Sequence, residues 1–181
     1  MTRVVAIPVV AGLLVCSLIL GGCVVRERLL EEEPAHAVSQ QTLVEVQADV
    51  KAVEVEIATF VPESQRIEIR EKPGGVISSC GAGGTSWGSS TTVVARVEPD
   101  LAQLNSDLER SWTRAADFSF ELTTGSTGEP RLIIDSERLG TYIVEVYAGE
   151  ADGDELRILS FSTCFAYDPE RDGHPWEIAA E

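Results

Sequence analysis

The sequence predicts an α+β domain in which two helices pack on one face of a mainly antiparallel sheet of about six strands. Two segments repeat apolar residues at alternating spacings of three and four, which is typical of amphipathic helices. Six further segments are rich in β-branched and aromatic residues, and the later ones are joined by short turns. Short connections favour antiparallel pairing, so we expect one α+β domain over residues 42–167.

The first helix is expected to begin after Thr42 and to end before Pro62. Residues 42–45 have the form of a capping box, with Glu45 in the third position. The many β-branched residues favour a strand, but about 19 residues would greatly exceed the usual strand of about 5 to 6. The apolar residues along one face of this helix could also form a coiled coil, although packing on a sheet is the more common role of so short a repeat. Its apolar residues are Leu43, Val46, Val50, Val53, Ile57 and Phe60.

The second helix is expected over residues 99–116, and strands occupy most of the remaining domain. Pro99 suits a first helical turn, and Asp100 favours the positive end of the helix dipole. Trp112 is expected to anchor the core. We expect a helix, two strands, the second helix and then a meander of four strands, with residues 168–181 as a loosely held tail. The strand segments begin at Arg66, Thr91, Asp117, Arg131, Thr141 and Leu156.

The amino terminus has the composition of an export signal. Arg3 precedes an uncharged apolar run over residues 4–20, which could also serve as an uncleaved transmembrane anchor. The run ends in Leu20, Gly21, Gly22 and Cys23, which resembles the lipobox of bacterial lipoproteins. This resemblance implies a signal peptide over residues 1–22, lipidation of Cys23 and a tether over residues 23–41. Two acyl chains hold a soluble domain on a membrane where one is marginal.

The charge balance limits the classes of partner. The chain has 30 acidic and 14 basic residues, for a net charge of −16. Cleavage before Cys23 removes one charged residue, Arg3, so the mature chain would carry −17. Nucleic acids and anionic lipids repel such a surface, so we expect no nucleic-acid partner and membrane attachment through acyl chains alone.

Two cysteines remain after the signal peptide and the lipidated residue are set aside. An even remainder in an exported chain favours a disulfide between Cys80 and Cys164, with two free thiols as the alternative. The loop that this pair would close spans about 85 residues, and loop entropy predicts on the order of 4 to 5 kcal/mol of stabilisation.

Residues 84–88 match the G-x-S-x-G pattern of a nucleophile elbow around Ser86. His174 follows later in the chain, with acids such as Asp135 between them, in the order found in hydrolases. An elbow needs a strand before the serine and a helix after it, whereas here a glycine-rich segment precedes and the β-branched residues 91–97 follow. We therefore expect Ser86 to lie in a mobile glycine-rich loop and not to act as a nucleophile.

No metal or cofactor site is expected. The acidic residues 150–155 lie between two strand segments and favour a hairpin turn over a calcium loop. Asp168, Asp172 and His174 could chelate a metal, but we expect them in the loosely held tail, where preorganisation is poor.

The layout of the chain resembles the small actinobacterial lipoproteins of the LppA-like family. The shared features are the lipobox at Cys23, the tether, an amphipathic helix, Cys80, a leucine-rich helix ending in Trp112, and Cys164. The resemblance implies a membrane-anchored domain outside the cytoplasm, of undetermined activity. We expect a non-enzymatic protein that binds an envelope protein, a wall polymer or a small apolar ligand. The alternatives are a surface serine hydrolase using Ser86 and a lipid carrier with a pocket between the helices and the sheet.

Overall fold

The fold was analysed in a computed structural model, which describes residues 38–81, 83–149 and 153–178. Cys23, the residues of the lipobox and most of the expected tether lie outside the described residues, as do residues 150–152 of the acidic turn. The helices are α1 (Leu43–Thr59), α2 (Leu101–Ser111), α3 (Pro169–Asp172) and α4 (Pro175–Ile178), with a 3-10 turn at Ala115–Asp117. The strands are β1 (Arg66–Glu71), β2 (Val76–Ser79), β3 (Thr85–Ala95), β4 (Ser119–Thr124), β5 (Pro130–Ser136), β6 (Gly140–Tyr147) and β7 (Asp154–Phe161).

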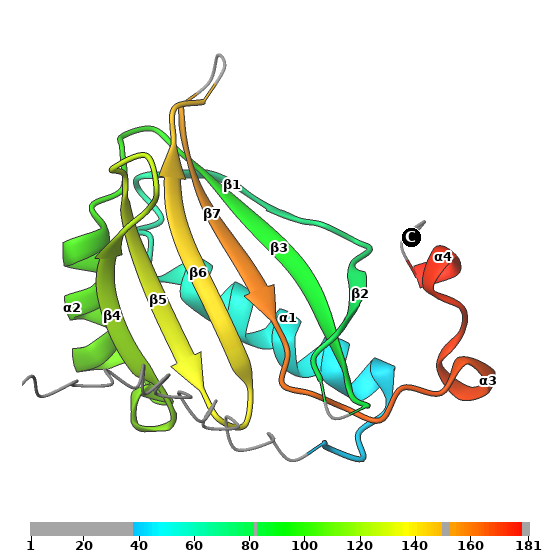
Figure 1. The fold of residues 1–181 in the computed structure, drawn as a ribbon. Coiled ribbons are helices and arrows are strands. Elements are labelled where there is room, and N and C mark those ends of the chain that lie inside the picture. The colour runs from blue at the N-terminus through cyan, green and yellow to red at the C-terminus, as the bar shows by residue number, and fades with distance from the viewer. Residues whose placement is uncertain (1–37, 82, 150–152, 179–181) are drawn as a thin grey trace, which may run out of the picture. The chain divides into compact units, whose positions relative to one another are not determined.

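The strands form one antiparallel sheet in the order β1-β3-β7-β6-β5-β4, as Figure 1 shows. Strands β4 to β7 make the expected meander, and β7 then pairs with β3. Strand β3 has 11 residues and pairs with β1 through one half and with β2 through the other. The long β3 thus joins the first part of the chain to the meander.

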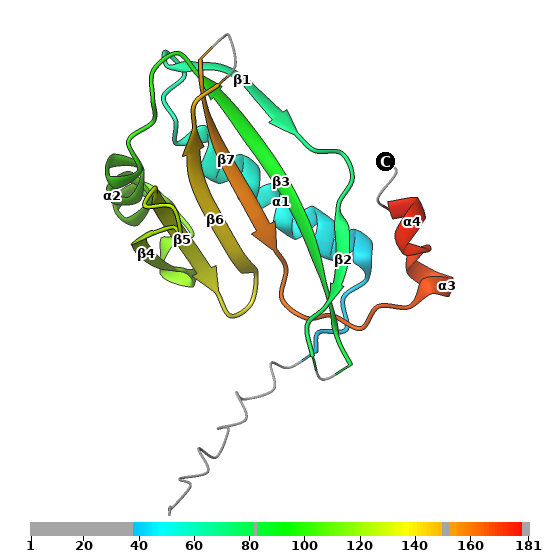
Figure 2. The same ribbon diagram turned by 45° about the horizontal axis from the view of Figure 1, so that its top comes forward.

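Both long helices lie on the same face of the sheet, which confirms the predicted fold class (Figures 1 and 2). Helix α1 packs on β3 and β7, and α2 packs on β4, β5 and β6. Helix α1 is also linked to the segment that follows α2. The indole Nε1 of Trp112 donates to a carboxylate oxygen of Glu56 at 2.7 Å, and Arg114 pairs with the same carboxylate at 3.1 Å.

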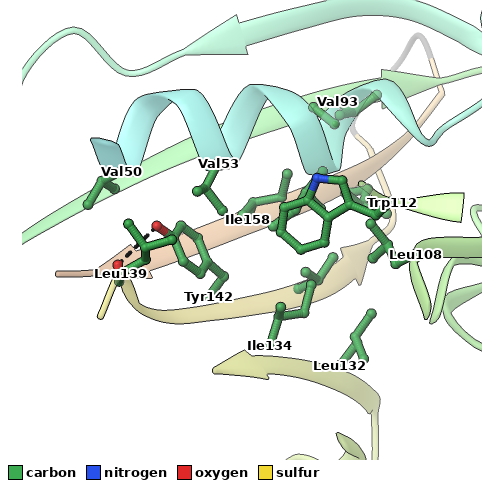
Figure 3. Close-up of a cluster of buried hydrophobic side chains, with 14 of the residues drawn as sticks. Val50, Val53, Val93, Leu108, Trp112, Leu132, Ile134, Leu139, Tyr142 and Ile158 are labelled. Carbon is green, nitrogen blue, oxygen red and sulfur yellow. Dashed lines mark hydrogen bonds between the residues drawn. The ribbon is translucent and has the colours of Figure 1, made fainter. Parts of the chain in front are cut away.

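The core lies between the helix layer and the sheet, and it is built from the apolar stripe of each helix (Figure 3). Val50 and Val53 of α1 meet Ile158 and Tyr142, while Leu108 of α2 lies over the β5 side of the sheet. Each fully buried side chain of this size contributes about 1.5 to 3 kcal/mol. After the end of α2, Trp112 of the core stacks on Phe118, with ring centroids 4.5 Å apart.

The starts of both helices agree with the sequence analysis, but the end of the second does not. Thr42 and Glu45 form the expected capping box. Helix α2 ends at Ser111, five residues before the expected Ala116, because the backbone of Trp112 turns to an extended conformation with ψ 124°. This turn sends the Trp112 side chain into the core and starts the path towards β4.

The expectation that Ser86 lies in a mobile glycine-rich loop is wrong. Residues 85–88 belong to β3, and the unexpected short strand β2 pairs with them. Glycine and serine have low strand propensity, but here they allow close packing. A Cβ on Gly75 would lie 2.4 Å from Nε1 of Trp87, and one on Gly88 would lie 3.2 Å from Val76. Tertiary packing therefore overrides local propensity in this segment.

The carboxy-terminal segment also differs from the loosely held tail that we expected. Residues 169–178 form α3 and α4, α4 lies beside β2, and Ile178 is buried in the core cluster. The Asp172 carboxylate accepts the backbone N–H of Leu43 at 3.2 Å, across 129 residues of sequence. The first N–H groups of a helix lack intrahelical partners, so the start of α1 offers this segment a place to bind.

Cys80 and Cys164 form a disulfide with their Cα atoms 6.0 Å apart. The bond joins the loop after β2 to the segment after β7, where Phe165 also pairs with Thr85 and Ser39. Within the described residues, no helix is long and apolar enough to cross a membrane.

Candidate functional site

The three residues of the hydrolase alternative are not joined in the described part of the chain. The Ser86 hydroxyl is buried in β3 and donates to the carbonyl oxygen of Ser162 at 2.8 Å. The ring of His174 stacks on Trp176 with centroids 4.3 Å apart, and the Asp135 carboxylate on β5 accepts the Thr141 hydroxyl. No hydrogen bond connects Ser86, His174 or Asp135 among the residues described.

The acidic residues near the carboxy terminus serve a structural role. The Arg171 guanidinium, with the N–H groups of Asp168 and Leu43, lowers the pKa of Asp172 to about 2. Asp168 in turn caps α3 by accepting the N–H of Glu170 at 2.9 Å. Over the described ranges, no group of three His, Cys, Asp or Glu side chains is placed to hold a metal ion.

Two hollows flank the short segment that leads from β3 into α2. The first, which we call the helix hollow, has a volume of about 170 Å³ and lies between the end of α1 and α2. The second, the strand hollow, measures about 490 Å³ and lies between the start of α2 and the strands β4 to β6. Glu98, Pro99 and Asp100 line both hollows and separate them.

The walls of the two hollows are mainly apolar. Both contain side chains from elements that are far apart in the sequence. The helix hollow is lined by Phe60, Val61, Pro62, Val97, Leu104 and Leu156. The strand hollow is lined by Pro99, Leu101, Leu122, Pro130 and Val146.

Local sequence signals explain why the segment between the hollows has a defined path. The Asp100 side chain accepts the N–H groups of Ala102 and Gln103, at 2.8 and 3.1 Å, and so starts α2 at this point. The N–H of Arg96 donates to the carbonyl oxygen of Gln65 at 2.8 Å. Residues 96–100 are thus held against the turn that follows α1.

The charged residues that line the two hollows are all acidic. They are Glu98, Asp100 and Asp107, and no lysine or arginine of the described chain lines either hollow. Asp100 is engaged as the helix cap, and Asp107 pairs with Arg110. Glu98 makes no hydrogen bond or ion pair with any other described residue. Its carboxylate is therefore free to attract a cation.

The apolar walls are partly exposed beside these acids. Val97 is 60% exposed and Leu122 is 45% exposed, although most residues of their type are buried. The space beneath α1 is filled by core side chains among the described residues (Figure 3), so of the two helices only α2 leaves a hollow against the sheet in the described chain, where the lipid-carrier alternative expects its pocket. The hollows lie at the edge of the helix layer.

Sequence reasoning did not identify this site. It located Pro99 and Asp100 as a helix start, but the hollows also need Phe60 from the end of α1 and Leu156 from β7. The one local signal in the sequence was the apolar Val97 directly before the acidic Glu98.

Comparison with known protein families and with characterised proteins gives no match. Among solved structures, the chain is similar to a DUF4853 family protein from Actinomyces odontolyticus, with a TM-score of 0.39 and 14% sequence identity. The similarity covers 67% of this chain and 62% of that chain, so this chain spans less than two thirds of the other protein's length.

Proposed function

We propose that this chain is a non-enzymatic cell-envelope lipoprotein that displays an acidic binding domain outside the cytoplasmic membrane. The observation that carries the proposal is the pair of apolar hollows around Pro99, whose charged lining residues are all acids. Apolar concave sites with a few oriented polar groups are the usual form of a binding site. Membership of the LppA-like actinobacterial lipoproteins is part of the same proposal, and the layout of the sequence supports it.

The anchoring part of the proposal rests on the run that ends in Cys23. The disulfide between Cys80 and Cys164 supports it, because such bonds persist mainly in oxidising compartments. The domain begins its pairing at Ser39, so the 16 residues after Cys23 span at most about 53 to 58 Å when fully extended. The acyl chains would hold the domain within this distance of the membrane.

The anchor is tested by labelling cells with a palmitate analogue. The wild-type protein should be labelled, and Cys23→Ala should lose the label and release or misprocess the domain. Cys16→Ala is the matched control, because Val15 before it does not suit a lipobox, and this variant should remain labelled. Undiminished labelling of Cys23→Ala would contradict the anchor.

The binding site is tested by photo-crosslinking in intact cells. A photoreactive amino acid at Val97, which is 60% exposed beside the hollows, should form specific adducts. The matched control is the same replacement at Val44, which is 71% exposed on α1 and lines neither hollow. Identical adducts from both positions, or none from Val97, would count against binding at the hollows.

The alternative activity, hydrolysis by Ser86, gains no support from the surroundings of that residue. Its hydroxyl donates a hydrogen bond to the Ser162 carbonyl oxygen, which is too weak a base to take up the proton and so does not activate the serine.

A further inference from the structure

We infer that the two hollows bind a short extended peptide of a partner protein, in which an aliphatic or aromatic side chain is flanked by lysine or arginine. The inference rests on the proposed function, since it takes the same hollows as the binding site. It adds the chemical class of the partner, which follows from the volume, the charge and the backbone of the site.

The volume of the helix hollow suits a single apolar side chain. An apolar cavity of about 150 Å³ holds one benzene molecule, so a hollow of about 170 Å³ accommodates one phenyl or branched aliphatic group. The strand hollow is larger and more open, at about 490 Å³, and can receive a second side chain.

The charge of the lining selects a basic partner. Glu98 lies between the hollows without a described partner, and the Asp100 carboxylate at the start of α2 adds a second negative charge to both hollows, whereas the charge of Asp107 is balanced by Arg110. A carboxylate or phosphate on the ligand would meet acids and no lysine or arginine of the described lining. The net charge of −16 favours encounter with cations, while the position of Glu98 sets where the cation is held.

The backbone between the hollows favours an extended peptide over a compact small molecule. Neither peptide group of Val97 and Glu98 makes a backbone hydrogen bond to another described residue, although Arg96 next to them does. An extended chain that crosses Pro99 can bond to these groups and place one side chain in each hollow.

The inference is tested with the full-length protein in a non-ionic detergent and three fluorescein-labelled peptides. The first is Gly-Lys-Leu-Lys-Phe-Lys-Gly, the second carries glutamate at each lysine, and the third carries serine for leucine and phenylalanine. Fluorescence anisotropy should show the first binding at least about tenfold more tightly than the third, because burial of one large apolar side chain is worth that factor. It should also bind more tightly than the second, whose carboxylates would meet the acids of the lining. Equal affinities for the first and third peptides, or preference for the second, would overturn the inference.

Two variants with the same change of charge separate the site from the overall field. Glu98→Gln should weaken binding of the first peptide about threefold, as expected for one exposed ion pair. Glu137→Gln, at an exposed position that lines neither hollow, should leave the affinity unchanged. Equal effects of the two variants would overturn the inference, since they would show attraction by net charge alone. If no peptide binds while Val97 still forms specific adducts in cells, the partner class is wrong and the proposed function stands.

Discussion

Glu54 is a buried carboxylate whose removal should destabilise the fold strongly. It lies on the core side of α1 and is 0% exposed. It accepts the Thr91 hydroxyl of β3 at 2.7 Å and the Ser160 hydroxyl of β7, and it pairs with Lys51 at 3.0 Å. Its charge also adds to the effect of burial in raising the pKa of Tyr142. A single side chain therefore connects α1 to two central strands.

The cost of Glu54→Ala follows from the groups that it would leave behind. Thr91 and Ser160 are fully buried, and each hydroxyl would lose its hydrogen-bond acceptor. Leaving a buried hydroxyl without a partner costs about 1 to 3 kcal/mol of stability. The Lys51 side chain is 20% exposed and keeps its hydrogen bond to the Lys72 carbonyl oxygen at 2.8 Å, so the loss of its ion pair adds little to the cost of the substitution. We expect a loss of about 3 to 5 kcal/mol in the free energy of unfolding, in line with other broken buried pairs.

Urea unfolding of the disulfide-bonded protein, followed by the fluorescence of the buried Trp87 and Trp112, measures this loss. Glu54→Gln keeps the volume and an acceptor oxygen, so it should cost only about 1 to 2 kcal/mol. Glu109→Ala, the same truncation at an exposed position on α2, should change stability by less than about 0.5 kcal/mol. If Glu54→Ala were no more harmful than Glu109→Ala, or if Glu54→Gln were as harmful as Glu54→Ala, the reasoning from lost acceptors would be refuted.

Four further outcomes are expected. Reduction of the Cys80–Cys164 disulfide, which closes a loop of 84 residues, should lower the free energy of unfolding by about 4 to 5 kcal/mol, and an unchanged urea midpoint would contradict this. Asp172→Ala should cost about 1 to 2 kcal/mol, because Leu43 loses its N–H acceptor. The native pKa of Asp172, about 2, lies below its ordinary value of 3.8, so its contribution is complete above pH 3.8 and is lost as the pH falls through 2. Stability measured between pH 4 and pH 2 should therefore fall less steeply in Asp172→Asn, and parallel curves would refute the linkage. A fluorophosphonate probe should not label Ser86, and stoichiometric labelling that disappears in both Ser86→Ala and His174→Ala would establish the hydrolase alternative.

The sequence by itself determined the parts of this protein that depend on local pattern. The capping box at Thr42 and the stripe of α1 are complete within 20 residues, and the alternation of β5, β6 and β7 is visible in each strand alone. The fold class followed, because short turns leave few ways to pair four successive strands. The partnership of Cys80 and Cys164 followed from their number rather than from their positions.

Tertiary structure decided the features that need residues from distant segments. Residues 85–88 form a strand because β2 pairs with them on one side and the end of β7 with the segment after it, through Phe165, pairs with them on the other; their own glycine and serine residues do not favour a strand. The carboxy-terminal segment is held in place because Ile178 joins the core cluster, α4 lies beside β2 and the start of α1 supplies an N–H group to Asp172. The helix hollow combines residues 60–65, 97–107 and 156, and the strand hollow combines residues 98–102, 122–124, 130 and 146. No local periodicity in the sequence indicates that these segments lie close together. Periodicity shows which face of an element is apolar, but only packing determines where that face is left uncovered and which acid beside it is left without a partner.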